Sequence, residues 1–323
     1  MNRAESSTHW QIYKVSLAGK ILYSLFFKPL SDLRVIKRVG YLKHQQVLKG
    51  KRQMKAASEN IKEIFKPGLP QYHVYFLTGK DHFFQTAFCL SSFQKATNAI
   101  QINAIFVDDG SIDGELTKRI TARFPHSEIM SASEIKQLLN KHLPESKFPS
   151  LRKRRLVYPH LRKLTDIHLL PGKWKLVLDS DMLFLSEPTE LLTWLNNPRE
   201  NIVMQDVETA YGYPEDLMQH LTGRKITDKI NVGVVGLESD RIDWQELEKW
   251  LHELQRREGD HYYQEQALTT MLLSKMPHSF LDADKYKVLP DAIEIETPKA
   301  TLHHYVAASK TDYFTRMWQK VNV

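Results

Sequence analysis

The stretch Lys175-Leu-Val-Leu-Asp-Ser-Asp-Met-Leu-Phe-Leu185 decides the fold that we expect. Lys175–Leu178 is the strongest strand signal in the chain, and a second apolar run begins at Met182. Asp179-Ser180-Asp181 therefore lies between two apolar segments. Carboxylates in such a place are costly to bury without a partner, and a divalent cation supplies one. The alternative is a helix cap or a surface turn.

Strand and helix signals alternate on both sides of this stretch. Asp81 and Ser133 are the expected N-caps of two of the helices. The alternation predicts an α/β fold, in which helices flank a Rossmann-like, mostly parallel sheet. Ligands of such sheets bind beyond the carboxyl ends of the strands. We expect strands near residues 72–79, 104–107, 128–130, 175–178 and 202–205, and helices near 82–96, 114–124, 134–143, 159–169 and 189–195.

The composition is that of a globular protein. The 323 residues are 42% hydrophobic and 26% charged, and this length suits one large domain or one domain with an appendage. The single cysteine, Cys89, excludes an intramolecular disulfide, favours a reducing, cytoplasmic compartment and lies in an apolar run that we expect to be buried. No run reaches the roughly 18 apolar residues of a spanning helix. We expect no secretory signal.

The net charge of +7 is concentrated near the N-terminus, where residues 1–66 carry 14 Lys/Arg and 4 Asp/Glu. Apolar residues recur there at helical spacing from Trp10 to Leu25. We therefore expect a basic helical extension over residues 1–68 and the main domain over residues 69–323. The extension either contacts the inner membrane surface or docks on the main domain. Arg34–Arg52 holds few aromatics and no nucleic-acid motif, so no nucleic-acid partner is expected.

Two further polar groups are candidates for binding. Asp108-Asp109-Gly110-Ser111 follows a predicted strand, where its carboxylates can accept hydrogen bonds from a ribose or a base, or simply form a turn. His303-His304 offers an imidazole ligand for a divalent ion, and Lys310 offers a charge for a phosphate. The alternative for the histidines is a partly exposed pair in a C-terminal loop.

Three other segments leave alternatives open. The glycines of Asn231-Val-Gly-Val-Val-Gly236 indicate a strand that another group approaches closely. Gln264 and Glu265 open an apolar helix, either as capping residues or as side chains that project into a pocket. The basic stretch Arg152–Arg155 either binds an anionic substrate or forms a solvated loop.

Taken in order, these segments resemble the GT-A glycosyltransferases, in particular glycosyltransferase family 8 and its relatives. The resemblance covers residues 70–315 and implies a GT-A fold. The matching residues are Thr78-Gly79, Arg162, Asp179-Ser-Asp181, Asp206, Asn231-Val-Gly233, Gln264-Glu265-Gln266, and His304 with Lys310.

The resemblance also implies a role for each residue. Asp179, Asp181 and His304 would ligate Mn²⁺ or Mg²⁺, and Lys310 would contact the donor diphosphate. Asp206 and Asn231 would hold sugar hydroxyls or the acceptor. Thr78, Gly79, Asp108, Asp109 and Arg162 would bind the donor. Gln264 and Glu265 would lie near the reacting carbon of the sugar.

The implied activity is transfer of a sugar from a nucleotide diphosphate sugar, foremost a UDP-sugar, to an acceptor hydroxyl in glycan or polysaccharide synthesis. The family usually has Asp-Gln-Asp where this chain has Gln264-Glu-Gln266, and Asp109-Gly-Ser111 looks more like the inverting family 2. Both the retaining and the inverting outcome stay open. Two other functions remain: a metal-dependent nucleotidyltransferase, and a non-enzymatic protein that binds a polyanion or a membrane surface.

Overall fold

The computed structural model describes residues 40–321 of the chain. The chain divides into two compact units, residues 1–50 and 51–323, and the candidate site lies in the second. Helix α3 (Tyr41–Ser58) belongs to the predicted basic extension and is helical as expected. The apolar spacing from Trp10 to Leu25 lies outside the described residues. In the described part of the chain, no helix combines the length and the apolar character needed to cross a bilayer.

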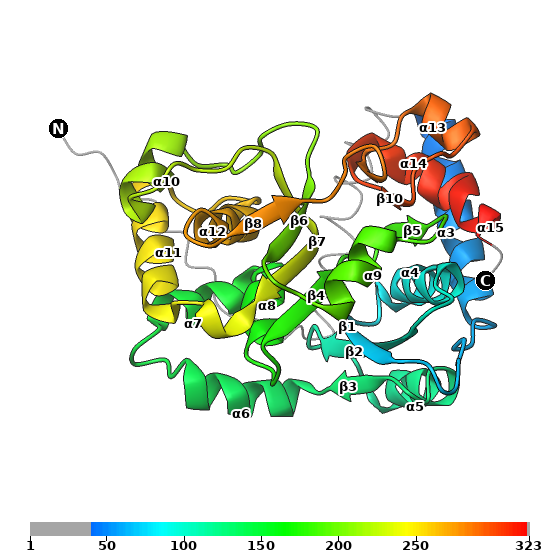
Figure 1. The fold of residues 1–323 in the computed structure, drawn as a ribbon, viewed down its shortest axis with the longest axis horizontal. Coiled ribbons are helices and arrows are strands. Elements are labelled where there is room, and N and C mark those ends of the chain that lie inside the picture. Colours follow the sequence, from blue (N-terminus) through cyan, green and yellow to red (C-terminus); the bar gives the residue numbers. More distant parts are fainter. Residues whose placement is uncertain (1–39, 322–323) are drawn as a thin grey trace. The chain divides into compact units, whose positions relative to one another are not determined.

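Within residues 40–321, the main sheet has seven strands in the order β3-β2-β1-β4-β7-β6-β8 (Figure 1). The pairs β3–β2, β2–β1, β1–β4 and β6–β8 are parallel, whereas β7 runs antiparallel to both β4 and β6. The predicted α/β class with a mostly parallel sheet is confirmed, and β7 is the exception. The strands are β1 (Gln71–Thr78), β2 (Gln101–Asp108), β3 (Glu128–Met130), β4 (Trp174–Leu178), β6 (Asn201–Gln205), β7 (Ile230–Glu238) and β8 (His278–Phe280).

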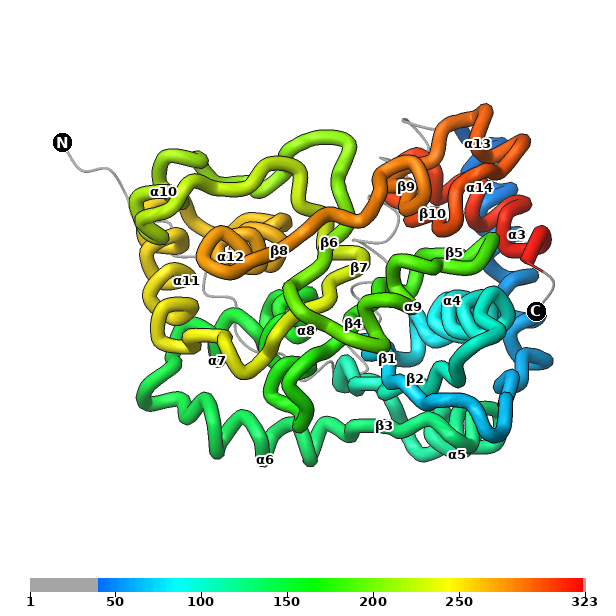
Figure 2. Tube along the Cα trace, in the orientation of Figure 1, coloured from blue at the N-terminus to red at the C-terminus, as the bar shows by residue number. Residues whose placement is uncertain are grey.

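A small sheet connects the middle of the chain with its C-terminal region. In the part that the structure describes, it contains β5 (Met182–Phe184), β9 (Tyr286–Val288) and β10 (Leu302–His304), in the order β5-β10-β9. β10 is antiparallel to β5, with His304 opposite Met182. Figure 2 shows β10 beside β5, although the two strands are far apart in the sequence. This pairing brings a C-terminal histidine next to the Asp-Ser-Asp turn.

Helices flank both faces of the main sheet (Figure 1). In chain order, the α-helices after β1 are α4 (Phe83–Ala96), α5 (Gly114–Arg123), α6 (Ala132–His142), α7 (Pro149–Val157), α8 (Leu161–His168), α9 (Thr189–Asn196), α10 (Glu215–Thr222), α11 (Trp244–Glu258), α12 (Gln264–Leu273), α13 (Ala292–Glu296), α14 (Lys310–Asp312) and α15 (Trp318–Lys320). The last three belong to the C-terminal segment that contains β10. On one face, apolar side chains of α6, α7, α8, α11 and α12 form a core with the strands. On the other, the rings of Phe83, Phe106 and Phe124 pack edge to face. Cys89 is buried in α4, as expected.

The two predicted N-caps were wrong. α4 follows His82, and neither Asp81 nor any other side chain provides a capping hydrogen bond at that end. Ser131 caps α6 instead of Ser133: its hydroxyl accepts from the Glu134 N–H, and the Glu134 carboxylate accepts from the Ser131 N–H. This reciprocal capping box satisfies two backbone donors, which Ser133 cannot do from inside the helix.

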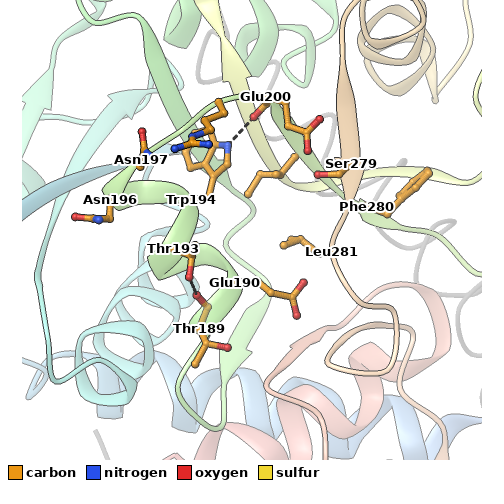
Figure 3. A pocket seen from close by; sticks show the side chains of 12 residues that line it. Thr189, Glu190, Thr193, Trp194, Asn196, Asn197, Glu200, Ser279, Phe280 and Leu281 are labelled. Carbon is orange, nitrogen blue, oxygen red and sulfur yellow. Dashed lines mark hydrogen bonds between the residues drawn. The ribbon is translucent and has the colours of Figure 1, made fainter.

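A groove of about 660 Å³ lies between α9 and β8 (Figure 3). Its walls include Trp194, whose indole N–H donates to the Glu200 carbonyl oxygen at 2.7 Å, and the exposed ring of Phe280. None of the residues selected from the sequence lines this groove. The candidate site lies instead at the carboxyl end of β4.

Candidate active site

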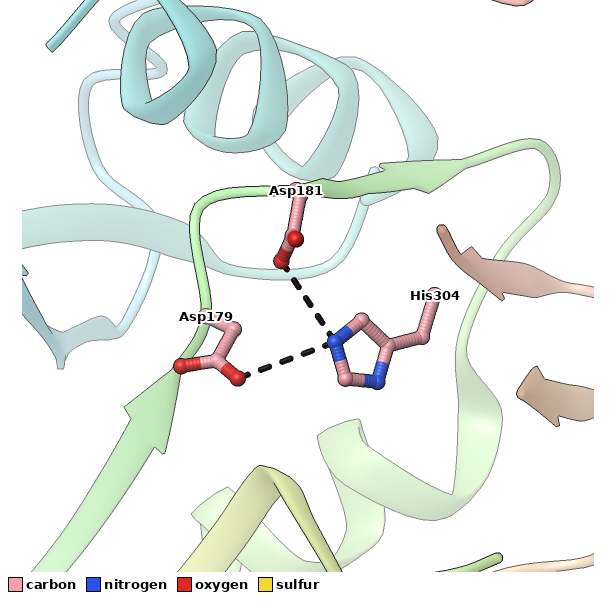
Figure 4. A group of neighbouring side chains, drawn as sticks. All are labelled: Asp179, Asp181 and His304. Atoms are coloured by element: carbon pink, nitrogen blue, oxygen red, sulfur yellow. Dashed lines mark ion pairs between the residues drawn. The ribbon is translucent and has the colours of Figure 1, made fainter. Parts of the chain in front are cut away.

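The Asp-Ser-Asp turn connects β4 to β5 at the carboxyl end of β4. The backbone on either side is fixed: the Asp179 N–H donates to the Gly233 carbonyl oxygen at 2.8 Å, and the Tyr305 N–H donates to the Asp181 carbonyl oxygen at 2.9 Å. The chain turns between these two anchored residues, and both carboxylates face the imidazole of His304 (Figure 4). The nearest oxygens of Asp179 and Asp181 lie 3.6 and 3.4 Å from His304 Nε2.

Hydrogen bonds hold His304 in the tautomer that a metal ligand needs. Its Nδ1 lies 3.1 Å from the Asn231 amide oxygen. The orientation of that amide is fixed, because its oxygen accepts from the Gly233 N–H and its nitrogen donates to the Asp206 carboxylate, both at 2.9 Å. The hydrogen of the neutral imidazole is therefore assigned to Nδ1. The lone pair of Nε2 then points toward the two aspartates.

The direction of β7 explains how Asn231 reaches this edge of the sheet. β7 runs antiparallel to β4, with Val234 opposite Leu178, so the start of β7 lies beside the end of β4. Gly233 leaves the space that His304 occupies, because a methyl group at this position would lie 2.5 Å from atoms of the imidazole ring. The close approach that the glycine pattern indicates is therefore that of His304.

The donor set fits a hard divalent cation. One oxygen of Asp179, one oxygen of Asp181 and a ring nitrogen of His304 lie within 4.8 Å of one another. Carboxylate oxygens and imidazole nitrogens are ligands of Mn²⁺ and Mg²⁺ sites. The distances from Nε2 to the carboxylates exceed those of ordinary hydrogen bonds. A cation, or a proton on Nε2, would stabilise these converging lone pairs, so the two are alternative occupants of one place.

The charges around Asp181 keep its carboxylate ionised. Although burial opposes ionisation, the contacts with His304 and Lys310 hold the pKa of Asp181 well below its ordinary value. His303 and His304 are both buried in β10, so the interpretation as a partly exposed pair in a loop was wrong.

Two lysines flank the aspartates. Lys310 Nζ lies 3.0 Å from Asp181 Oδ2. Lys163 projects from α8, is buried, and donates to Asp179 Oδ1 at 2.8 Å and to the Val232 carbonyl oxygen at 2.9 Å. Its partners more than offset its burial, so the pKa of Lys163 is raised above its ordinary value. Both side chains are therefore cationic beside the predicted metal ligands.

Sequence reasoning selected Arg162 and missed its neighbour Lys163. The structure directs Arg162 to the loop after β2, where Nη1 donates to the Asp109 carbonyl oxygen. Lys163 is the residue that contacts Asp179. The helical spacing indicated that Lys163 is buried. It lies four residues before the buried Ile167 and therefore on the same helix face, which is directed at the sheet.

Glu265 is a further buried carboxylate near Asp179. It lies in the first turn of α12, and its Oε2 is 3.8 Å from Lys163 Nζ, so the lysine contacts both acids. Burial, opposed by Lys163 and assisted by the Asp179 carboxylate, raises the pKa of Glu265 to about 7. A carboxyl group with such a pKa can hold or release a proton near neutral pH.

Gln264 is engaged in contacts on the other side of α12. Its amide oxygen accepts from Arg154 Nε, and its amide nitrogen donates to the Tyr213 hydroxyl at 2.7 Å. Arg154 also pairs with Asp260 at 2.7 Å. The interpretation of Arg152–Arg155 as a solvated loop was wrong, because the stretch lies in α7 and the Arg154 guanidinium is buried against these partners.

The loop after β2 forms a turn that is stabilised by its own side chains. The Asp109 carboxylate accepts from the Ser111 hydroxyl at 2.5 Å and packs against Gly79, where a methyl group would overlap with it. One oxygen of Asp108 is fully used in this turn. It accepts at 2.8 to 2.9 Å from the backbone N–H groups of Gly110, Ser111 and Ile112.

A chain of hydroxyl groups connects β1 with the Asp-Ser-Asp turn. Thr78 Oγ1 lies 2.7 Å from Thr86 Oγ1, which lies 2.8 Å from Ser180 Oγ. Because β1 and β4 are adjacent in the sheet, Thr78 and the aspartates share one sheet edge. The structure thus brings Asp179, Asp181, His304, Lys310 and Glu265 together. Asp108 and Asp109 lie in the neighbouring loop after β2, and the Arg162 side chain reaches that loop from α8.

Comparison with protein-family models gave no match, and neither did comparison with curated protein sequences. Solved structures do match in fold. Mouse xyloside xylosyltransferase 1, in its apo form, has a TM-score of 0.50 and 14% identity, over 72% of this chain and 97% of that one. The galactosyltransferase LgtC, in complex with donor and acceptor sugar analogs, has a TM-score of 0.50 and 13% identity, over 78% and 96%. The chain has the GT-A glycosyltransferase fold, as its sequence resemblance implied.

Proposed function

We propose that the protein is a metal-dependent glycosyltransferase that moves a sugar from a nucleotide diphosphate sugar, foremost a UDP-sugar, to an acceptor hydroxyl. The observation that carries this proposal is the cluster of Asp179, Asp181 and His304 at the carboxyl edge of a GT-A sheet, with Lys310 beside it. Two carboxylates, an imidazole and a lysine are suited to binding a cation together with a diphosphate. The three ligands would hold Mn²⁺ or Mg²⁺.

The side chains around the cluster have distinct tasks in this proposal. The bound cation would neutralise negative charge on the leaving diphosphate. Lys310 adds a point charge at the same place, where charge develops as the sugar leaves. Asn231 keeps the imidazole of His304 turned toward the aspartates, and Asp206 orients Asn231.

We propose that the donor nucleoside lies along the loops after β1 and β2. Thr78, Gly79 and Arg162 border these loops. The Asp109 carboxylate would accept hydrogen bonds there from a ribose hydroxyl or from an N–H group of the base. Asp108 supports the turn with one oxygen, which leaves its second oxygen for the donor.

Glu265 is the carboxylate that we propose lies next to the reacting carbon. If it takes the proton of the acceptor hydroxyl, the product is inverted; if no carboxylate reaches that proton, a retaining front-face route follows. Gln264 would then fix the start of α12 through Arg154 and Tyr213. The anomeric configuration of the product, measured by proton NMR, distinguishes the two routes.

The experiment that tests the function is incubation of the protein with Mn²⁺ and a panel of UDP-sugars. We expect UDP as the product, with loss of activity in EDTA. Asp181→Ala should lower turnover on the order of 100-fold or more, because it removes one of the charge-stabilising groups. Asp284→Ala, at an exposed aspartate outside the site, is the control. Pyrophosphate as the product would favour a nucleotidyltransferase, and EDTA-insensitive turnover by Asp181→Ala would exclude the metal role.

We further propose that residues 69–323 form the catalytic domain, and that residues 1–68 form an extension that contacts anionic lipid. The support is the excess of basic residues and the absence of any acidic residue from α3. Sedimentation with phosphatidylserine vesicles should then be salt-sensitive. Equal sedimentation with neutral vesicles would contradict the lipid contact.

A further inference from the structure

Two helices begin side by side at the candidate site. α8 and α12 pack against each other, and their N-terminal turns carry the contacting side chains Lys163 and Glu265. Three residues before these lie His160 and Tyr262, whose rings are 5.5 Å apart in an edge-to-face arrangement. Lys163 and Glu265 are buried, whereas His160 and Tyr262 are exposed. From Asp179 toward solvent, the buried pair Lys163 and Glu265 (the inner pair) comes first, and the exposed pair His160 and Tyr262 (the outer pair) comes second.

Tyr262 exposes its ring although its backbone is fixed. The residue is 65% exposed. Its carbonyl oxygen accepts from the Tyr158 hydroxyl, the preceding carbonyl of His261 accepts from Arg154 Nη2 at 3.3 Å, and the ring of Tyr263 packs edge-on at 5.2 Å. An aromatic ring on a fixed backbone loses little conformational freedom when a ligand packs on it.

The inner pair connects the outer pair to the cluster of aspartates. Lys163 Nζ lies 2.8 Å from Asp179 Oδ1 and 3.8 Å from Glu265 Oε2. Because His160 and Tyr262 precede these two residues by three positions at the starts of the same helices, they lie on the solvent side of the inner pair, next to the site.

We propose that Tyr262, with His160 beside it, is the platform that binds the acceptor, and that the acceptor is a saccharide; this inference rests on the proposed function. A sugar ring has an apolar C–H face that packs on an aromatic ring, and a rim of hydroxyls that hydrogen-bond to the polar ends of Tyr and His. A sugar held there presents its inner hydroxyls toward Glu265. An acyl chain would gain nothing from the polar ends of these rings.

Saturation-transfer NMR with a panel of methyl glycosides tests the platform directly. The full chain is used with Mn²⁺ and UDP, and dodecanol is the lipid-like probe. We expect glycosides to bind the wild type, Tyr262→Phe and the control Phe280→Ala, which alters an exposed ring on β8. Tyr262→Ala, checked for folding by its melting temperature, should bind about tenfold more weakly or worse. Unchanged binding by Tyr262→Ala, no glycoside binding to the wild type, or binding of dodecanol alone would overturn the proposal.

Turnover separates this inference from the proposed function. If the wild type releases no UDP from any nucleotide sugar, the proposed function fails, while the NMR result still decides whether Tyr262 binds a saccharide. In the active enzyme, Tyr262→Ala should raise the KM for the acceptor glycoside far more than it lowers kcat. A variant with unchanged acceptor KM would show that Tyr262 is not part of the acceptor site.

Discussion

His303 and His304 are adjacent in the sequence but serve different parts of the molecule. Side chains alternate along β10, so the two imidazoles point to opposite sides. His303 lies 2.8 Å from the Glu294 carboxylate and 3.0 Å from the Tyr305 hydroxyl, contacts that stabilise the small sheet. His304 faces the two aspartates. A single position along the strand thus separates a structural histidine from a proposed metal ligand.

We expect His304→Gln to lower the affinity for Mn²⁺ by at least about 100-fold, since a ligand nitrogen is lost. His303→Gln should lower the melting temperature and leave the affinity for Mn²⁺ close to that of the wild type. Isothermal titration calorimetry of both variants measures this difference. Equal affinities in the two variants would contradict the assignment of His304.

We expect Glu265→Gln to remove a pH dependence of stability. Burial is the main reason that the pKa of Glu265 rises from 4.5 to about 7, so the folded protein binds a proton that the unfolded chain releases. The stability of the wild type therefore falls as the pH rises through this interval, by roughly 3 kcal/mol in total. Urea unfolding of both proteins at about pH 5 and about pH 8 measures the effect. Parallel changes in the wild type and in Glu265→Gln would contradict it.

At the scale of elements, the sequence predicted which segments form strands and helices better than it predicted the direction of each strand in the sheet. The apolar run Lys175–Leu178 and the alternation around it were sufficient to predict the sheet and its mostly parallel character. The antiparallel direction of β7 was not predicted, because its residues are buried on both faces and look the same in either direction. This direction is what places the start of β7, with Asn231, beside the end of β4.

The contacts within the site depend on such long-range pairings. His304 reaches the aspartates only because β10 pairs with β5 in one register, and no local pattern encodes that register. The family resemblance selected His304 where spacing alone could not. Lys163 was missed because a lysine in a helix is usually exposed, and only its packing against β4 and β7 reveals its burial.

The two glycines of β7 give a prediction at this scale. A methyl group at Gly233 would meet His304, whereas one at Gly236 would meet Trp194 and Ile202. Gly233→Ala should therefore lower the affinity for Mn²⁺ at least about tenfold by displacing the imidazole. Gly236→Ala should cost about 1–3 kcal/mol of stability with Mn²⁺ binding retained. Calorimetry and urea unfolding separate these effects, and native Mn²⁺ affinity in Gly233→Ala would count against the arrangement.

At the scale of the whole described domain, the candidate site lies where the two sheets meet. Asp179 directly follows β4 of the main sheet, and His304 is the last residue of β10 in the small sheet. A shared cation would connect two segments that are far apart in the sequence. Ligands that bind only the folded state stabilise it, so Mn²⁺ binding and folding of this region are coupled.

The most direct test of the central claim is anomalous X-ray scattering from crystals of the protein grown with Mn²⁺ and UDP. We predict one manganese peak that is coordinated by Asp179, Asp181 and His304 and contacts the UDP diphosphate. A manganese ion bound elsewhere, or UDP bound without any metal at these three residues, would contradict the account.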